Sequence, residues 1–202
     1  MGITAKRGSV SDKTYTVSGK TLAEISKDMD RKGPVDPNDG KRFSGSCLGK
    51  LDLSIKPNDI EFELKSSGAN FGAVASLKGG SVTSTAVITV PKLASNKELS
   101  DAARKEWERF LVFVGVHERG HADSYYGLAV TVMQDLSSMT APGVGKSEKE
   151  AKAAATKALF DKITKKYGGT GLADLIKADA KAYDASNKHG ESQGALLKTS
   201  IT

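Results

Sequence analysis

The strongest constraint on the fold of this 202-residue chain is a change in hydrophobic periodicity near residue 95. Before that point apolar residues recur with a period of two, most clearly at 60–64 and 82–90, which predicts strands. A helix is expected at 21–29, because Thr21 and Glu24 form a capping box ahead of apolar residues at helical spacing. After residue 95 the spacing becomes helical. Strands followed by helices predict an α+β fold, with an N-terminal antiparallel sheet and then a helical half.

We expect a single domain over residues 1–202, with a β-rich part at 1–95, a helical part at 96–186 and a C-terminal loop at 187–202. Within the helical part, residues 96–139 form one long helix, or two helices that break near Gly115 or Gly120. The Pro- and Gly-rich stretch 139–145 predicts a loop, and a capping box at Ser147 opens the next helix.

A histidine motif lies in the middle of the helical part. The sequence H-E-R-G-H occupies residues 117–121, and the almost wholly apolar stretch 110–116 would bury the helix that carries it. Four residues advance an α-helix by about 400°, so His117 and His121 lie one turn apart on one face, with Glu118 about 100° around from His117. In an H-E-x-x-H site the histidines bind Zn²⁺ and the glutamate acts as general base. The alternative is a chance pattern with two unrelated surface histidines.

The scarcity of histidine and cysteine limits what could complete such a site. The chain has three histidines and one cysteine, Cys47, so neither an intrachain disulfide nor a cysteine-based zinc site can form. A catalytic zinc usually takes three protein ligands. The third ligand is then His189, the remaining histidine, or a carboxylate such as Glu148 or Glu150.

Several polar residues are candidates for supporting roles at the metal. A zinc-binding histidine normally donates its second N–H to a carboxylate or carbonyl, and Asp123, Asp135 and Asp184 could each accept it. Tyr183, six residues before His189, could donate a hydrogen bond to a developing oxyanion. The alternatives are ordinary polar helix residues for the aspartates and packing on the core for Tyr183.

The charge and hydropathy of the chain bear on its partners and location. The net charge is +6, but few aromatic residues interleave with the lysines, so no nucleic-acid partner is expected. No stretch approaches the ~20 apolar residues of a membrane span. Residues 1–7 contain no apolar segment of a signal peptide. An intracellular protein and an exported protein whose signal was removed both agree with this start.

Three stretches carry a resemblance to a known family: residues 15–21 with Ile25, residues 107–121 from Trp107 to the end of the motif, and the Tyr-Asp…His-Gly segment at 183–190 with Gly194. In these stretches the chain resembles the predicted bacterial secreted zinc-dependent proteases, a family catalogued largely as a domain of unknown function. The resemblance implies that His189 is the third zinc ligand. It also implies that the protein is secreted or periplasmic.

The sequence therefore predicts a zinc metallopeptidase that acts on a protein or peptide substrate. In this hypothesis His117, His121 and His189 hold Zn²⁺, and Glu118 takes a proton from water and passes it to the leaving amine. A zinc amidase that acts on the cell wall would use the same chemistry. The competing class is a non-catalytic binding or scaffold protein, in which the motif is degenerate or the metal is structural.

Overall fold

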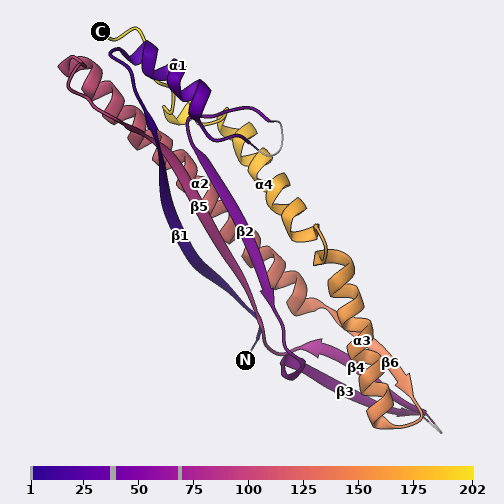
Figure 1. Cartoon of the computed structure of the whole chain (residues 1–202). Coiled ribbons are helices and arrows are strands. Elements are labelled where there is room, and N and C mark those ends of the chain that lie inside the picture. Colours follow the sequence, from indigo (N-terminus) through magenta and orange to yellow (C-terminus); the bar gives the residue numbers. More distant parts are fainter. Residues whose placement is uncertain (1, 37–39, 68–69) are drawn as a thin grey trace. The chain divides into compact units, whose positions relative to one another are not determined.

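A computed structural model of the chain describes residues 2–36, 40–67 and 70–202 (Figure 1). It confirms the predicted α+β fold, with an antiparallel-rich N-terminal part followed by a helical half. In chain order the elements are β1 (Thr4–Val17), α1 (Leu22–Lys32), β2 (Ser46–Ser54), the 3₁₀ turn η1 (Pro57–Asp59), β3 (Ile60–Ser67), β4 (Asn70–Leu77), β5 (Ser81–Leu93), α2 (Asp101–Ser138), β6 (Thr140–Gly145), α3 (Glu148–Tyr167), α4 (Gly171–Asn187) and the 3₁₀ turn η2 (Glu191–Gln193).

These elements form two compact units, each drawn from three stretches of the chain. Unit 1 comprises Met1–Gly8, Lys50–Ser84 and Tyr125–Ile176, and unit 2 comprises Ser9–Gly49, Thr85–Ser124 and Lys177–Thr202. Elements β1, β2, β5, α2 and α4 contribute residues to both units. The single domain expected over residues 1–202 stays a prediction, and each unit is described here by itself.

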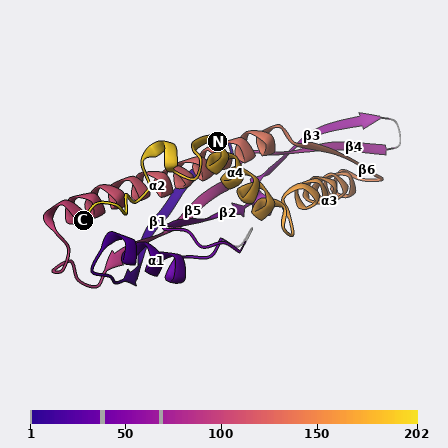
Figure 2. The ribbon, with the colours of Figure 1, turned by 90° about the horizontal axis from the view of Figure 1, so that it is seen from above.

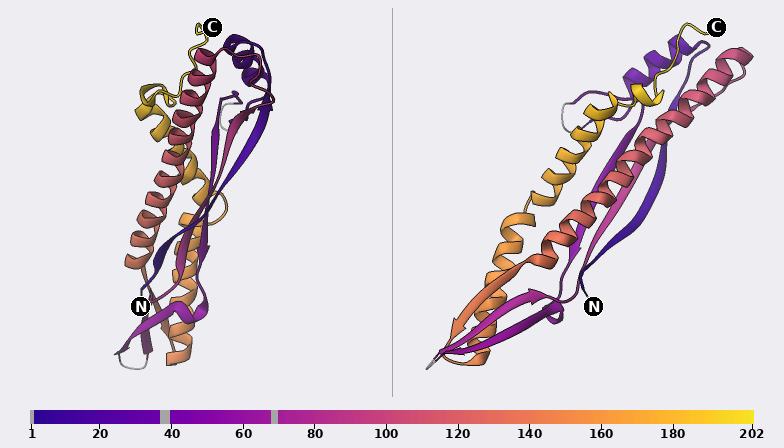
Figure 3. Two further views of the ribbon diagram at one scale, coloured as in Figure 1. Left: turned by 90° about the vertical axis from the view of Figure 1, so that its left-hand side faces the viewer. Right: turned by 180° about the vertical axis from the view of Figure 1, so that it is seen from behind.

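Unit 1 is built on a three-stranded antiparallel sheet with the order β3-β4-β6. Helix α3 lies along this sheet in all views of the ribbon (Figures 2 and 3). The helix begins at the predicted N-cap, where Ser147 accepts a hydrogen bond from the backbone N–H of Glu150. The unit closes around a core of apolar side chains, whose buried members are Ile3, Leu51, Ile60, Ala73, Ala75, Leu77, Val82, Ala129, Val132, Leu136, Ala141, Ala151, Ala155, Leu159, Ile163 and Tyr167.

The prediction of a loop at residues 139–145 was wrong, because strand β6 occupies almost all of this stretch. It pairs antiparallel with β4, with Pro142 opposite Val74. Because β6 is last in the strand order β3-β4-β6, the N–H that Pro142 lacks is not needed there. The glycines that indicated a loop instead let α3 approach, since a Cβ on Gly143 would lie 2.1 Å from the backbone N of Ala155. The predicted helical half therefore contains a strand.

Helix α2 is one continuous helix of 38 residues, so neither Gly115 nor Gly120 breaks it. The hydroxyl of Ser100 accepts a hydrogen bond from a backbone N–H of its first turn. Residues 101–124 of this helix belong to unit 2 and residues 125–138 to unit 1. Within the described residues, no helix is both long and apolar enough to cross a membrane.

Unit 2 packs α1 and the first part of α2 around a second apolar core. The predicted N-cap of α1 is present, because Thr21 accepts from Glu24 N at 3.2 Å. The Glu24 carboxylate accepts from Lys20 N at 2.7 Å, one residue before the cap, so the second bond of the predicted capping box is displaced. Strands β1, β5 and β2 form a sheet in that order. The buried residues of this core are Val17, Leu22, Ile25, Met29, Leu99, Ala103, Trp107, Phe110, Val114 and Leu197.

Candidate metal centre

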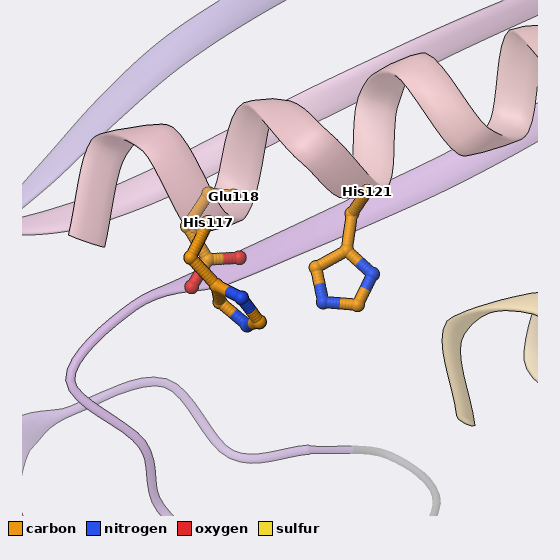
Figure 4. A group of neighbouring side chains, drawn as sticks. All are labelled: His117, Glu118 and His121. Atoms are coloured by element: carbon orange, nitrogen blue, oxygen red, sulfur yellow. The ribbon is translucent and has the colours of Figure 1, made fainter. Parts of the chain in front are cut away.

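Helix α2 carries three buried side chains that could hold a metal ion: His117, Glu118 and His121. The helix is anchored at this point because Phe110 and Val114, on the preceding turns, are buried in the core of unit 2. Figure 4 shows both imidazoles projecting from the same side of the helix, one turn apart, as the spacing predicts. One ligand atom from each of the three residues lies within 4.8 Å of the other two. The local sequence thus produces a compact donor group of two imidazoles and one carboxylate.

A fourth polar side chain, Asp184 of α4, faces the two imidazoles. Its Oδ1 atom lies 3.3 Å from Nε2 of His117 and 3.0 Å from Nε2 of His121. Its other oxygen, Oδ2, lies 3.6 Å from Nδ1 of His189. Burial acts to raise the pKa of Asp184, but the hydrogen bonds from His117 and His121 hold that pKa well below its usual range. Asp184 is therefore an ionised carboxylate between all three histidines of the chain.

The carboxyl group of Glu118 has a different environment from that of Asp184. Burial raises the pKa of Glu118 to about 7, the charge of His117 acts to lower it, and the charge of Asp184 adds to the rise. A carboxyl group with a pKa near neutrality can both accept and release a proton at physiological pH. The site thus keeps Asp184 ionised and gives the neighbouring Glu118 a pKa close to neutrality.

The side chain of Gln193, next to η2, links two residues of the site. Its Oε1 lies 3.0 Å from Nδ1 of His117, and its Nε2 donates to the hydroxyl of Tyr183 at 3.0 Å. A metal bound at Nε2 of His117 would replace the proton that Asp184 accepts there, while the proton on Nδ1 would still be donated to Gln193. The Tyr183 ring lies 4.6 Å from the ring of His121, measured between centroids. Gln193 was not among the residues predicted from the sequence.

Two glycines have backbone positions that a side chain could not occupy. A Cβ on Gly120, inside the histidine motif, would lie 1.8 Å from the hydroxyl of Tyr183. Gly190 has φ of 81° and lies against the His117 ring, where a Cβ would be 3.0 Å from Cγ. These contacts give a physical reason for the glycine in H-E-R-G-H and for the glycine after His189.

The turn between Tyr183 and Gly190 is fixed by its own hydrogen bonds. The buried side chain of Asn187 donates to the carbonyl of Tyr183 at 2.7 Å and accepts from the N–H of Gly190 at 2.8 Å. Lys188 and His189 both have a positive φ, 53° and 52°, so the chain turns sharply there. The backbone N–H of His189 donates to the carbonyl of Asp184 at 3.0 Å. Asp184 and His189 are thereby held next to each other.

An ion pair on α2, between the buried Glu106 and the partly exposed Arg109, binds the chain that follows this turn. Both oxygens of Glu106 accept from Arg109 at 2.7 Å, and Oε1 also accepts from the N–H of Lys198 at 2.9 Å. The guanidinium of Arg109 donates to the carbonyls of Gly194 and Leu196, each at 2.7 Å. The segment that carries Gln193 is thus tied to the same helix as the histidine motif, two to three turns before it.

His189, the residue expected to be the third ligand, is placed near the motif but outside the buried donor group. Its side chain is 56% exposed, compared with 9% for His117 and 7% for His121. The imidazole stacks on Phe43, with 5.4 Å between ring centroids.

The other sequence candidates have contacts of their own. Glu148 forms an ion pair with Lys152, and the Glu150 carboxylate accepts from the N–H of Lys146. Asp135 accepts from Lys166 and from Tyr167, both at 2.6 Å. Asp123 is exposed on α2. Of the three aspartates considered from the sequence, Asp184 is the one that the structure brings to the histidines.

The fold and the site define a class of protein: an α+β protein with a buried His-Glu-His group that could bind a metal ion. Comparison with known protein families assigns the chain to one of them. The chain belongs to the family described as bacterial protein of unknown function (DUF922), whose model matches residues 12–190. That range includes the motif on α2 as well as Asp184 and His189. No curated protein and no solved structure gives a significant match to the chain.

Proposed function

We propose that this protein is a zinc-dependent metallopeptidase. The observation that carries the proposal is the juxtaposition, on the buried face of one helix, of two imidazoles that face the same carboxylate oxygen and a glutamate whose pKa is raised to about 7. The imidazole and carboxylate donors suit zinc, and thiolate is not needed for such a site. His117 and His121 would supply two ligands. The third would come from the segment 184–189, where the sequence favours His189.

The residues around the site have separate roles in the proposed peptide-bond hydrolysis. Zinc bound here would polarise the scissile carbonyl and lower the pKa of water to about 7. Glu118 takes a proton from that water and holds it on its carboxylate. Burial favours this role because it raises the pKa of the Glu118 carboxyl group to about 7. Glu118 then delivers the proton to the leaving amine. Tyr183 accepts a hydrogen bond from Gln193, so its own hydroxyl proton is left for donation to the developing oxyanion.

The substrate is proposed to be a peptide or protein, and the location secreted or periplasmic. Both rest on the resemblance of the chain to secreted zinc proteases, and the matched family is bacterial. Fractionation of cells that produce the full natural protein would test the location. Recovery in the cytosol alone would contradict it.

The decisive experiment compares wild type with Glu118→Gln and with a control, Glu108→Gln, which changes an exposed glutamate on the same helix. We expect wild type and both variants to bind about one zinc per chain by elemental analysis. Hydrolysis of a mixed peptide library, followed by mass spectrometry, should fall about 10²–10⁴-fold in Glu118→Gln alone. Surviving activity in Glu118→Gln contradicts its role as base, and loss of zinc in that variant makes Glu118 a ligand instead.

The same experiment separates the competing functions. A wild type that binds zinc and cleaves peptidoglycan stem peptides at an amide, but no library peptide, would favour a cell-wall amidase. A wild type with no bound metal and no hydrolysis would favour a binding or scaffold protein.

A further inference from the structure

We infer that Asp184, and not His189, is the third protein ligand of the metal, and that His189 instead supports the Asp184 carboxylate. The inference rests on the metal site of the proposed function and specifies its donor set as two imidazoles and one carboxylate. It reverses the roles that the sequence suggests for the two polar residues of the Tyr-Asp…His-Gly segment.

The first argument is the spacing of the donor atoms. In a tetrahedral site with metal–ligand distances of about 2.0–2.2 Å, neighbouring ligand atoms are about 3.3–3.5 Å apart. Oδ1 of Asp184 lies 3.3 Å from Nε2 of His117 and 3.0 Å from Nε2 of His121. Both imidazole–carboxylate separations are therefore within a few tenths of an ångström of the distance that a shared ion requires.

The second argument is which atoms face each other. Nδ1 of His117 is held by Gln193, so Nε2 is the nitrogen that remains for a metal, and it is this atom that faces Asp184. His121 likewise presents Nε2 to the same oxygen of Asp184. Two nitrogens from one helix thus face one oxygen from α4. A ligand set assembled from these atoms would need little reorganisation.

The third argument is the position of His189. It contacts the donor group at Oδ2 of Asp184, whereas the imidazoles of His117 and His121 contact Oδ1. The ring is stacked on Phe43 and more than half exposed, whereas Asp184 is 18% exposed. A ligating carboxylate usually has its second oxygen hydrogen-bonded. The His189 imidazole, an ion-pair contact at 3.6 Å, becomes a suitable donor to that oxygen once it closes by a few tenths of an ångström. His189 therefore fits the role of a positioning residue behind Asp184.

The test measures metal affinity and does not depend on any activity. Zinc and cobalt(II) affinities would be measured by chelator competition for wild type, Asp184→Ala, His189→Ala and a control, Asp101→Ala, in which an exposed aspartate at the start of α2 is changed. Loss of a ligand should reduce affinity by more than 100-fold in Asp184→Ala. Loss of a supporting residue should reduce it by about 10–100-fold in His189→Ala. The control should bind like wild type.

A structural readout on the wild type protects the test against variants that fail to fold. X-ray absorption of the zinc-loaded protein counts coordinated imidazoles, and two are expected. Three imidazoles, or a greater loss of affinity in His189→Ala than in Asp184→Ala, would overturn the assignment while leaving a metal site in place. Failure of the wild type to bind either metal would overturn the proposed function itself, so the two failures are distinguishable.

Discussion

The two units of this protein bury different kinds of side chain. In unit 1 the buried side chains are apolar apart from the phenols of Tyr125 and Tyr167 and the hydroxyl of Ser84, among the described positions of that unit. Unit 2 has a smaller apolar core and also buries charged or polar side chains, which are Asp28, Glu106, His117, Glu118, His121 and Asn187. The contrast is visible along α2, whose residues 106–121 contribute the buried polar groups and whose residues 129–136 are buried as Ala129, Val132 and Leu136.

Under the proposed function, stability rests mainly on the core of unit 1 and chemistry on the polar groups of unit 2. A buried polar group destabilises the fold unless hydrogen bonds satisfy it. Unit 2 satisfies such groups through networks, as where Asp28 accepts from the N–H of Ser18 at 2.9 Å and from Lys32 at 2.7 Å. A metal centre needs rigid supporting contacts of this kind around its donors. We therefore expect core substitutions in unit 1 to change stability, and polar substitutions in unit 2 to change metal binding.

The largest expected effect on stability comes from Leu159→Ala in unit 1. Leu159 is fully buried in α3, so its truncation should lower the free energy of unfolding by about 2–5 kcal/mol, measured by urea titration. Zinc affinity measured well below the melting temperature should stay at the wild-type value. Leu64→Ala is the matched control, because Leu64 is 47% exposed in the same unit. A fall in zinc affinity in folded Leu159→Ala would show that the two units are not separable in this way.

The next effect concerns Gln193 and should appear in metal affinity. Gln193→Ala removes the partner of Nδ1 of His117, so zinc affinity should fall by about 10–100-fold in chelator competition. Gln193→Glu keeps an acceptor oxygen and should restore most of that loss. The control is Gln134→Ala, which changes an exposed glutamine of α2. Equal affinity in Gln193→Ala and wild type would mean that the contact does not orient His117.

The same contrast explains how far the sequence alone could go. Local patterns identified the capped helices α1 and α3 and the motif on α2, because capping, periodicity and the i, i+4 spacing depend on neighbours in the chain. Strand β6 was missed because Pro142 and Gly143 are turn formers by local rules. Their tolerance in a strand depends on the edge position and on the approach of α3.

The candidate site divides in the same manner. His117, Glu118 and His121 were found from one short motif, and the structure places them in one buried group. Asp184 was one of three aspartates that the sequence could not rank, since its contact with His121 spans 63 positions. No motif spacing in the sequence points to Gln193. Its position between two glycines, just after the Tyr-Asp…His-Gly segment, was a signal that could have been noticed.

A smaller effect is expected from the buried ion pair of unit 2, and it should depend on pH. Hydrogen bonds from Arg109 hold the pKa of Glu106 below its ordinary value, against the effect of burial. A lowered pKa in the folded state stabilises the fold above the unfolded pKa of about 4.3 and loses this effect as the pH falls further. Glu106→Gln should therefore be less stable than wild type by on the order of 1 kcal/mol at pH 7.

Thermal melts between pH 7 and pH 3.5 would check the sign of this effect. The difference in melting temperature between wild type and Glu106→Gln should be constant down to about pH 5 and shrink below about pH 4.3. Glu98→Gln, an exposed change in the same unit, serves as control. A difference that widens as the pH falls would contradict the assignment of Glu106 as an ionised partner of Arg109.

The smallest effect is expected from an exposed ion pair of unit 1, which completes the comparison with Glu106 and Arg109. Lys157 and Asp161 are one turn apart on α3, with 2.6 Å between Nζ and Oδ2, but their side chains are 78% and 64% exposed. Exposed pairs at this spacing contribute about 0.3–0.5 kcal/mol, and a lysine placed before the acid is the less favourable order with respect to the helix dipole. Asp161→Asn should therefore change the free energy of unfolding by no more than about 0.3 kcal/mol, and 1 M salt should abolish the change. A loss as large as that of Glu106→Gln would mean that burial does not set the strength of these two pairs.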